Sequence, residues 1–216
     1  DARFRVVARP AAGIVAALNA GLALCRAPHV ARMDADDLMH RQRLAAQLTA
    51  LAADPGLAGL GCHVRLFPRA GLAHGMRAYE SWLGSLSTPA EVARDAFVEC
   101  PLAHPTWMVR REVFARLPYR DRGWPEDHDW LLRAHRAGLR LGVVPRRLLL
   151  WRTGHARLSR SDPAYALERF TACKAHHLAR GFLSGGERYV LWGYGHTGRA
   201  LRKALGQEGR RPSHVV

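Results

Sequence analysis

Between residues 13 and 67 the sequence alternates between helical and extended patterns. Residues 13–26 carry apolar side chains at four-residue spacing, and residues 30–33 form a short extended run. A second helical pattern follows, with its apolar face at Leu44, Leu48 and Leu51. Residues 57–67 are again extended. Because strands that alternate with helices usually join one sheet in parallel, this order predicts an α/β fold with a mostly parallel sheet flanked by helices.

The alternation continues less regularly through the rest of the chain. Thr88-Pro89-Ala90-Glu91 is a capping box with proline at the first helical position, which predicts a helix to about Phe97. The later patterns predict a strand at 107–110, a helix from Pro125 to Gly138, a strand at 139–144 and a helix at 162–180.

Residues 188–199 combine a strand pattern, a glycine-rich turn and the start of a helix. The glycines stand at 193, 195 and 198 in the order G-x-G-x-x-G, which is typical of the first unit of a Rossmann-like domain. Either they let backbone approach a pyrophosphate, or they only allow a strand and a helix to cross closely.

Two boundaries follow from these patterns. Ser184-Gly185-Gly186 is the best linker candidate, so we predict one domain over residues 1–183 and the start of a second, truncated one over residues 184–216. The chain opens on Asp1 without an initiator Met, and we expect it to begin inside a longer protein.

The 216 residues include 33 basic and 18 acidic side chains, a formal net charge of +15. All the basic residues except Lys174 and Lys203 are arginines. Arginine binds phosphate and carboxylate groups in a bidentate manner, so anionic partners are expected. The arginines are spread along the chain and form no single stripe, so nucleic acid is not the expected partner.

The hydrophobic runs and the cysteines lead us to expect a cytoplasmic protein. No stretch approaches the ~18 consecutive apolar residues of a membrane span, and no signal-peptide pattern opens the sequence. The four cysteines lie far apart without metal-binding spacing, at Cys25, Cys62, Cys100 and Cys173. We expect them to be reduced thiols.

Asp34-Ala35-Asp36-Asp37 comes directly after the extended run 30–33. Alternation in an extended chain places Asp34 and Asp36 on the same side. The carboxyl ends of strands are where open α/β sheets bind ligands, and Mg²⁺ or Mn²⁺ would relieve the repulsion between these carboxylates and hold diphosphate oxygens. The alternative is that the acids only begin a helix, where they meet the positive end of its dipole.

Residues 13–21 and 30–37 resemble the inverting family-two glycosyltransferases, which have the GT-A fold. In that family a helix with an Asn precedes a strand and a DxD motif that binds the nucleotide sugar through a metal ion. Asn19 stands at the place of this Asn, where it either reaches the donor or, as we expect, bonds to backbone within its own helix.

Three later segments extend the resemblance over residues 3–180. Trp124-Pro125-Glu126-Asp127 resembles the family's Glu-Asp pair, whose Asp acts as base, although the same residues also make a good helix start. Residues 104–111 resemble the strand beside the acceptor pocket, and residues 151–159 resemble the closing basic loop.

The resemblance implies a role for each matched residue. The catalytic residues would be Asp127 and Glu126, and the metal ligands for Mn²⁺ or Mg²⁺ would be Asp36, Asp34 and His155. Asp34, Arg152 and Arg157 would bind the donor, and His104 and Trp124 would bind the acceptor.

The implied function is metal-dependent, inverting transfer of a sugar, of hexosyl type, from a nucleotide-sugar donor to a glycan or lipid-linked acceptor. Its setting would be surface polysaccharide biosynthesis, in the cytoplasm or in peripheral association with the inner face of the membrane. Family members begin with a strand, a helix and a strand that hold the nucleotide base, and this chain starts after them, so we expect an N-terminally truncated GT-A domain.

Two other functions fit parts of the pattern. A nucleotidyltransferase that makes nucleotide sugars also uses acidic metal ligands, although it usually has a glycine-rich triphosphate loop that this sequence lacks. A basic module that binds nucleic acid or an anionic surface would fit the net charge, with the acids serving only as helix starts.

Overall fold

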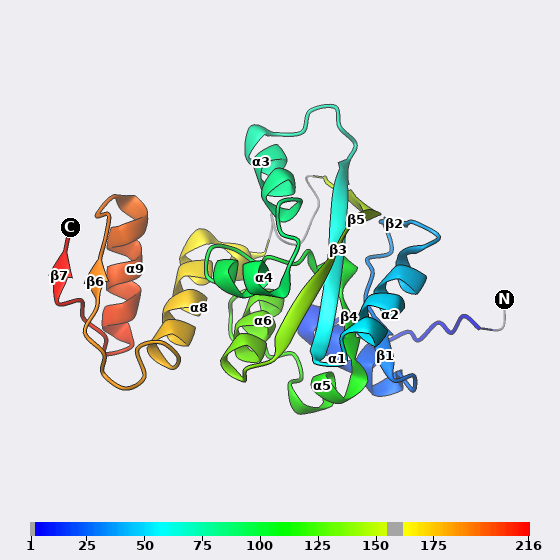
Figure 1. Cartoon of the computed structure of the whole chain (residues 1–216), viewed down its shortest axis with the longest axis horizontal. Coiled ribbons are helices and arrows are strands. Elements are labelled where there is room, and N and C mark those ends of the chain that lie inside the picture. The colour runs from blue at the N-terminus through cyan, green and yellow to red at the C-terminus, as the bar shows by residue number, and fades with distance from the viewer. Residues whose placement is uncertain (1–2, 155–161) are drawn as a thin grey trace.

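The computed structural model describes residues 3–154 and 162–216. Its larger sheet has the strand order β1-β4-β3-β5-β2. The strands are β1 (His29–Ala31), β2 (Leu38–Met39), β3 (Leu57–Phe67), β4 (Met108–Arg110) and β5 (Arg140–Arg152). The two longest, β3 and β5, pair along almost their whole length and form the centre of the sheet (Figure 1).

The α/β, GT-A-like class is confirmed, but the strand directions correct the prediction of a mostly parallel sheet. Only the β3–β5 pair is parallel in the described sheet, and the other three pairs are antiparallel. β1, β3 and β5 do share one direction, as helical crossovers require. The sequence pattern did not reveal that β4 inserts antiparallel between β1 and β3, because alternation along the chain does not say which strands become neighbours.

Helices flank this sheet on both sides. They are α1 (Gly13–Leu24), α2 (Arg43–Ala53), α3 (His74–Leu83), α4 (Pro89–Asp95), α5 (Arg111–Arg116), α6 (Glu126–Arg136) and α8 (Leu167–Ala179), with short 3-10 turns η1 (His104–Thr106) and η2 (Pro163–Tyr165). Figure 1 shows α2 on one side of β3, and α4 and α6 on the other. The predicted capping box of Thr88 and Glu91 begins α4.

Two apolar clusters hold these layers together. One is built around aromatic side chains beneath α6, including Trp107, Phe114 and Trp130. The other lies between α2, α3 and the central strands, with Leu60, Leu66 and Leu148 buried in it. Burial of a large apolar side chain contributes about 1.5–3 kcal/mol. These clusters therefore hold the end of β1 and the start of α6 in place relative to the sheet.

The buried face of α2 differs from the predicted one. Leu44 and Leu48 are exposed, whereas Arg43 and Gln47 are buried together with Leu51. The two polar side chains are buried because they hydrogen-bond each other: Arg43 Nε donates to Gln47 Oε1 at 3.1 Å. Gln47 Nε2 in turn donates to the Thr106 carbonyl at 2.7 Å, which ties α2 to the turn η1. Apolar periodicity alone cannot detect a helix face made of paired polar groups.

The C-terminal residues form a small unit beside α8 (Figure 1). β6 (Val190–Leu191) and β7 (His214–Val215) pair in parallel, and α9 (His196–Gln207) connects them. A buried cluster of Ala175, Leu183, Ala204 and Leu205 packs α9 on α8. The strand-turn-helix order confirms the predicted local pattern, and the domain boundary at residue 184 stays a prediction.

A steric contact explains one glycine of the G-x-G-x-x-G turn, Gly198. A Cβ at this position would lie 2.0 Å from the Gly193 carbonyl oxygen, whereas a Cβ at Gly195 meets nothing within 4 Å. The close approach of the turn to α9 therefore accounts for Gly198 without any ligand.

The structure also bears on the membrane and cysteine predictions. In residues 3–154 and 162–216, no helix is long and apolar enough to cross a bilayer. All four cysteines are free thiols, as predicted, and three of them are buried.

Candidate active site

A cavity of about 590 Å³ opens at the end of β1, between the acidic cluster and the first turn of α6. Asp34 and Asp36 line one side of it, and Glu126 and Asp127 line the other. The fold thus brings together two acidic pairs that are about ninety residues apart in the sequence. His104, also predicted as a site residue, lies in the wall between them.

Asp34 is neutralised by a neighbouring cation. Arg32 holds its carboxylate with both guanidinium nitrogens, Nη2 to Oδ1 at 2.6 Å and Nη1 to Oδ2 at 3.1 Å. The Arg32 side chain is largely buried, and its backbone carbonyl accepts from Arg43 Nη2 at 2.7 Å. The bidentate pair fixes Asp34 in place and occupies both its oxygens.

Asp36 and Asp37 differ in what they do. Asp37 is buried, and its Oδ1 accepts from the Arg152 backbone N–H at 2.7 Å. The Arg152 side chain donates through Nε to the Asp36 carbonyl at 2.8 Å and lies over the Phe67 ring. These bonds join the acidic cluster to the end of β5, while the Asp36 carboxylate itself remains exposed at the cavity.

Glu126 is a buried carboxylate with two side-chain donors. Tyr165 Oη donates to its Oε2 at 2.5 Å, and His104 Nδ1 lies 3.4 Å from its Oε1. Burial acts to raise the pKa of Glu126, but the hydrogen bonds from His104 and Tyr165 outweigh it, and the net pKa is lowered. Glu126 is therefore ionised at neutral pH.

The tautomer of His104 follows from its partners. An ionised Glu126 only accepts, so His104 Nδ1 carries the proton, and Nε2 accepts from Tyr119 Oη at 2.8 Å. Burial lowers the pKa of His104 to about 4, so the ring is neutral. Asn19 holds Tyr119 by exchanging two hydrogen bonds with its backbone, of 3.0 and 3.1 Å. The expectation that Asn19 bonds to backbone within its own helix is therefore wrong, because its backbone partner lies 100 positions away.

Asp127 is half-buried and faces the cavity. Burial, reinforced by the negative charge of Glu126, raises the pKa of Asp127 to about 7. Its Oδ1 accepts from the His128 backbone N–H at 2.7 Å, which orients the carboxyl group. A carboxyl group with this pKa both takes up and releases a proton near neutral pH, as a general base must.

Asp36 is the acidic side chain of this cluster whose carboxylate is open to a hard divalent cation. Its exposed carboxylate supplies the oxygen ligand that Mg²⁺ or Mn²⁺ prefers, and no hydrogen bond to it is made within residues 3–154 and 162–216. Asp34 fits less well, because a cation there would have to displace Arg32 from its carboxylate.

Three other predicted site residues lie elsewhere or outside the description. Trp124 does not line the cavity: its Nε1 donates to Asp129 Oδ1 at 3.1 Å, and its ring packs on His176. His155 and Arg157 fall outside the described residues.

Sequence analysis missed Arg32 and Tyr165. Arg32 lies two residues before Asp34 on the same side of an extended chain, so the alternation that paired Asp34 with Asp36 also includes it. Tyr165 carries no comparable signal, because its contact with Glu126 spans 39 residues and depends on how α8 packs.

The family model described as "Glycosyl transferase family 2" matches residues 1–117, more than half of the chain. The chain belongs to this family. The match includes Asp34, Asp36 and His104, while Glu126 and Asp127 lie beyond it. No curated protein sequence is significantly similar to this family-two chain.

Two solved structures of TarS share the fold of this family-two chain at low sequence identity. TarS of S. aureus, residues 1–349 in complex with UDP-GlcNAc, matches with a TM-score of 0.55 and 12% identity over 87% of this chain and 50% of that 1–349 chain. A longer S. aureus TarS structure matches with a TM-score of 0.52 and 14% identity over 90% of this chain and 31% of its own. The mannosyltransferase PcManGT from Pyrobaculum calidifontis, in complex with GDP-Man and Mn²⁺, matches with a TM-score of 0.48 and 18% identity over 91% and 49% of the two chains. This chain thus spans half or less of each of these proteins.

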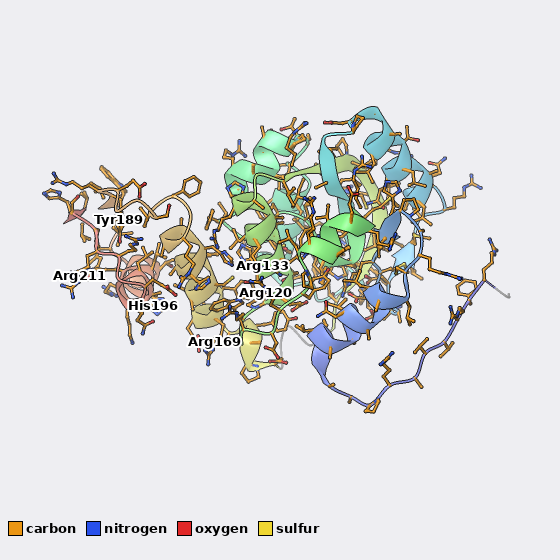
Figure 2. All side chains as sticks on the ribbon, turned by 90° about the horizontal axis from the view of Figure 1, so that it is seen from below. Arg120, Arg133, Arg169, Tyr189, His196 and Arg211 are labelled. Carbon is orange, nitrogen blue, oxygen red and sulfur yellow. The ribbon has the colours of Figure 1, made fainter. Side chains whose placement is uncertain are left out.

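Arginines of this family-two chain come from several separate elements. Arg120, Arg169 and Arg211, labelled in Figure 2, come from the loop before α6, from α8 and from the loop before β7. Arg133, also labelled, is buried and paired with Asp129 at 2.7 Å.

Proposed function

We propose that the chain forms part of an enzyme that transfers a sugar from a nucleotide-sugar donor to an acceptor hydroxyl. The observation that carries this proposal is the single cavity lined by Asp34, Asp36, Glu126 and Asp127, in a chain of glycosyl transferase family 2. Family membership favours sugar transfer over the two alternatives, nucleotidyl transfer and nucleic-acid binding.

Asp127 is the proposed general base. The acceptor hydroxyl must lose its proton as it attacks the anomeric carbon, and Asp127 is the half-buried carboxyl group in the cavity with a pKa near 7. Glu126 does not compete for that proton, because Tyr165 and His104 stabilise its ionised form. One base acting in a single displacement inverts the anomeric centre.

The leaving diphosphate must be stabilised on the opposite side of the cavity. Mn²⁺ or Mg²⁺ bound at Asp36 would neutralise the negative charge that develops on it. Arg152 lies against the same turn and provides a second cation, and Arg157 and His155 are proposed to complete this side of the site. Asp34, held by Arg32, is proposed to accept a hydrogen bond from the donor.

The acceptor is proposed to be a glycan or lipid-linked saccharide in surface polysaccharide biosynthesis, with a hexose as the transferred sugar. His104 lines the cavity and is proposed to border the acceptor site. Peripheral association with the inner face of the membrane is part of the same proposal. So is the division into a glycosyltransferase domain over residues 1–183 and the start of a second domain over residues 184–216.

A donor screen tests this function. UDP- and GDP-sugars are titrated into the wild-type chain by calorimetry with and without Mn²⁺, and transfer to glycan acceptors is followed by mass spectrometry. We expect one donor to bind only with Mn²⁺, and Asp36→Asn to abolish that dependence. Metal-independent binding that is equal in wild type and Asp36→Asn contradicts the proposal.

A further inference from the structure

Tyr165 contacts the acidic pair of α6 from a distant part of the chain. Its hydroxyl donates to Glu126 Oε2 at 2.5 Å, a short bond of the kind that forms between an O–H group and a charged carboxylate. Tyr165 also lines the cavity, so it belongs to the same site as the carboxylate that it contacts.

The turn that carries Tyr165 is held by its own hydrogen bonds. Asp162 Oδ1 accepts from the Ala164 N–H at 2.8 Å, and the Asp162 carbonyl accepts from the Tyr165 N–H at 3.0 Å. Pro163 stands at the first position of η2, where its fixed φ suits the turn. The hydroxyl is therefore positioned by η2 and not drawn in by Glu126 alone.

The segment after Tyr165 packs along the first turn of α6. The Phe170 ring lies 6.1 Å from the His128 ring, and His177 Nε2 lies 3.0 Å from Asp129 Oδ1. Tyr165, Phe170 and His177 thus contact residues 126, 128 and 129. Three successive contacts fix η2 and α8 to the start of α6.

Groups from several elements face Glu126. His104 from η1 is neutral and donates through Nδ1, so it adds no net charge. The other titratable or charged groups lining the same cavity are Arg32, Asp34 and Asp36 at and after the end of β1, Tyr79 on α3, Glu99 and Cys100 before η1, and Asp127 on α6. Among the described residues, Tyr165 and His104 are the two side chains that donate to the Glu126 carboxylate.

We infer that Tyr165 is a positioning residue that keeps Glu126 ionised and oriented beside Asp127, so that the turn η2 sets the charge of the carboxylate pair. This inference rests on the proposed function for its catalytic meaning. Held as a fixed negative charge, Glu126 disfavours a second ionised carboxylate nearby and so keeps Asp127 basic enough to accept a proton. Tyr165 acts on the base through Glu126 and touches no reacting atom.

The test compares wild type with Tyr165→Phe, which removes only the hydroxyl. Carboxyl titrations are followed by NMR on chains carrying ¹³C-labelled Asp and Glu. In Tyr165→Phe the titration midpoint of Glu126 is expected to rise by about one to two pH units, because its ionised form loses a donor. Phe170→Leu, which alters packing in the same segment and leaves the hydroxyl, is the matched control and should leave Glu126 unchanged.

Glu126→Gln is the second variant, for the case that Tyr165→Phe does not fold. With the neighbouring negative charge removed, Asp127 should titrate below its wild-type midpoint of about 7. An unchanged Glu126 midpoint in folded Tyr165→Phe, or an unchanged Asp127 midpoint in Glu126→Gln, overturns the inference.

Transfer kinetics separate this inference from the proposed function. If sugar transfer occurs, Tyr165→Phe should lose ~10-fold in kcat with an unchanged donor KM, since the hydroxyl contacts neither donor nor metal site. If the wild-type chain transfers no sugar, the proposed function fails, and the NMR titrations still decide the role of Tyr165.

Discussion

The backbone N–H of Arg152 donates a 2.7 Å hydrogen bond to Asp37 Oδ1, and this bond joins the acidic cluster to the end of β5, 115 residues away. Three adjacent carboxylates therefore have three different environments. Asp34 pairs with Arg32, Asp37 is buried against β5, and Asp36 keeps an exposed carboxylate. Because the three carboxylates have different partners, substituting each of them should have a different effect.

Asp37→Ala should destabilise the fold, whereas Asp36→Asn should not. Loss of a buried acceptor leaves the Arg152 N–H without this partner, and such a change typically reduces the free energy of unfolding by ~1–3 kcal/mol. Urea unfolding followed by circular dichroism measures both variants. Equal midpoints for Asp37→Ala and wild type would show that the contact is not structural.

Asp36→Asn should abolish Mn²⁺-stimulated donor binding, while Asp34→Asn should weaken donor binding without removing the metal effect. The reason is that Arg32 already occupies both oxygens of Asp34. Calorimetric titration of Mn²⁺, with and without nucleotide sugar, distinguishes the two. If only Asp34→Asn lost the metal effect, Asp34 and not Asp36 would be the metal ligand.

Asp127→Asn should retain donor affinity and lose transfer by ~10²–10⁴-fold, because the base contacts the acceptor and not the diphosphate. Parallel collapse of donor affinity would mean that Asp127 is structural and that another group is the base.

The same variant should also change how stability depends on pH. The pKa of Asp127 is raised in the folded state, so between pH 4 and 7 the native chain binds more protons than the unfolded chain, and this group makes stability fall as pH rises. Asp127→Asn removes that loss. Its melting temperature should exceed that of wild type at pH 8, and the difference should disappear near pH 4. A constant difference across this range argues against a raised pKa.

Transfer by the wild-type chain should increase with pH through about 7, as Asp127 loses its proton. His104 has a pKa lowered to about 4 by burial and should add no second transition between pH 5 and 8. A pH profile of kcat/KM checks both statements. A transition near pH 6.5 that disappears in His104→Asn would show that His104 titrates as an exposed histidine does.

Gly198→Ala should destabilise the C-terminal unit, and Gly195→Ala should be tolerated. The added Cβ would lie 2.0 Å from the Gly193 carbonyl oxygen in the first variant and would meet nothing within 4 Å in the second. Faster amide hydrogen exchange in residues 190–215 would report the loss of stability in Gly198→Ala.

We also expect no NAD(H) binding to the 216-residue chain by calorimetry, and clear micromolar binding would assign a nucleotide site to the turn that contains Gly193, Gly195 and Gly198.

Elements whose cause is local could be read from the sequence. The Thr88 capping box, the strand 57–67 and the helix that starts after Pro125 depend on residues within a few positions of one another, and they occur as predicted. The two acidic pairs were found in the same way, as short motifs after a strand and at a helix start.

Contacts between distant segments could not be read from it. The antiparallel insertion of β4, the burial of Arg43 against Gln47 and the packing of Trp124 away from the cavity each depend on which elements become neighbours. None of these contacts leaves a periodic pattern in the sequence. A hydrogen bond between two distant residues requires only one donor group and one acceptor group, and neither has to be repeated along its element.

The same division holds within the site. Local pattern was enough to identify Asp34, Asp36, Glu126 and Asp127 as candidates, since each pair stands in a short motif, one after a strand and one at a helix start. The ionised state of Glu126 depends on Tyr165 and His104, which reach it from other elements of the fold. Arg32 pairs with Asp34, and the Arg152 backbone holds the neighbouring Asp37. Burial and hydrogen bonding shift the pKa of a carboxyl group only once the chain is folded, so which of the four takes the proton is a property of the tertiary structure.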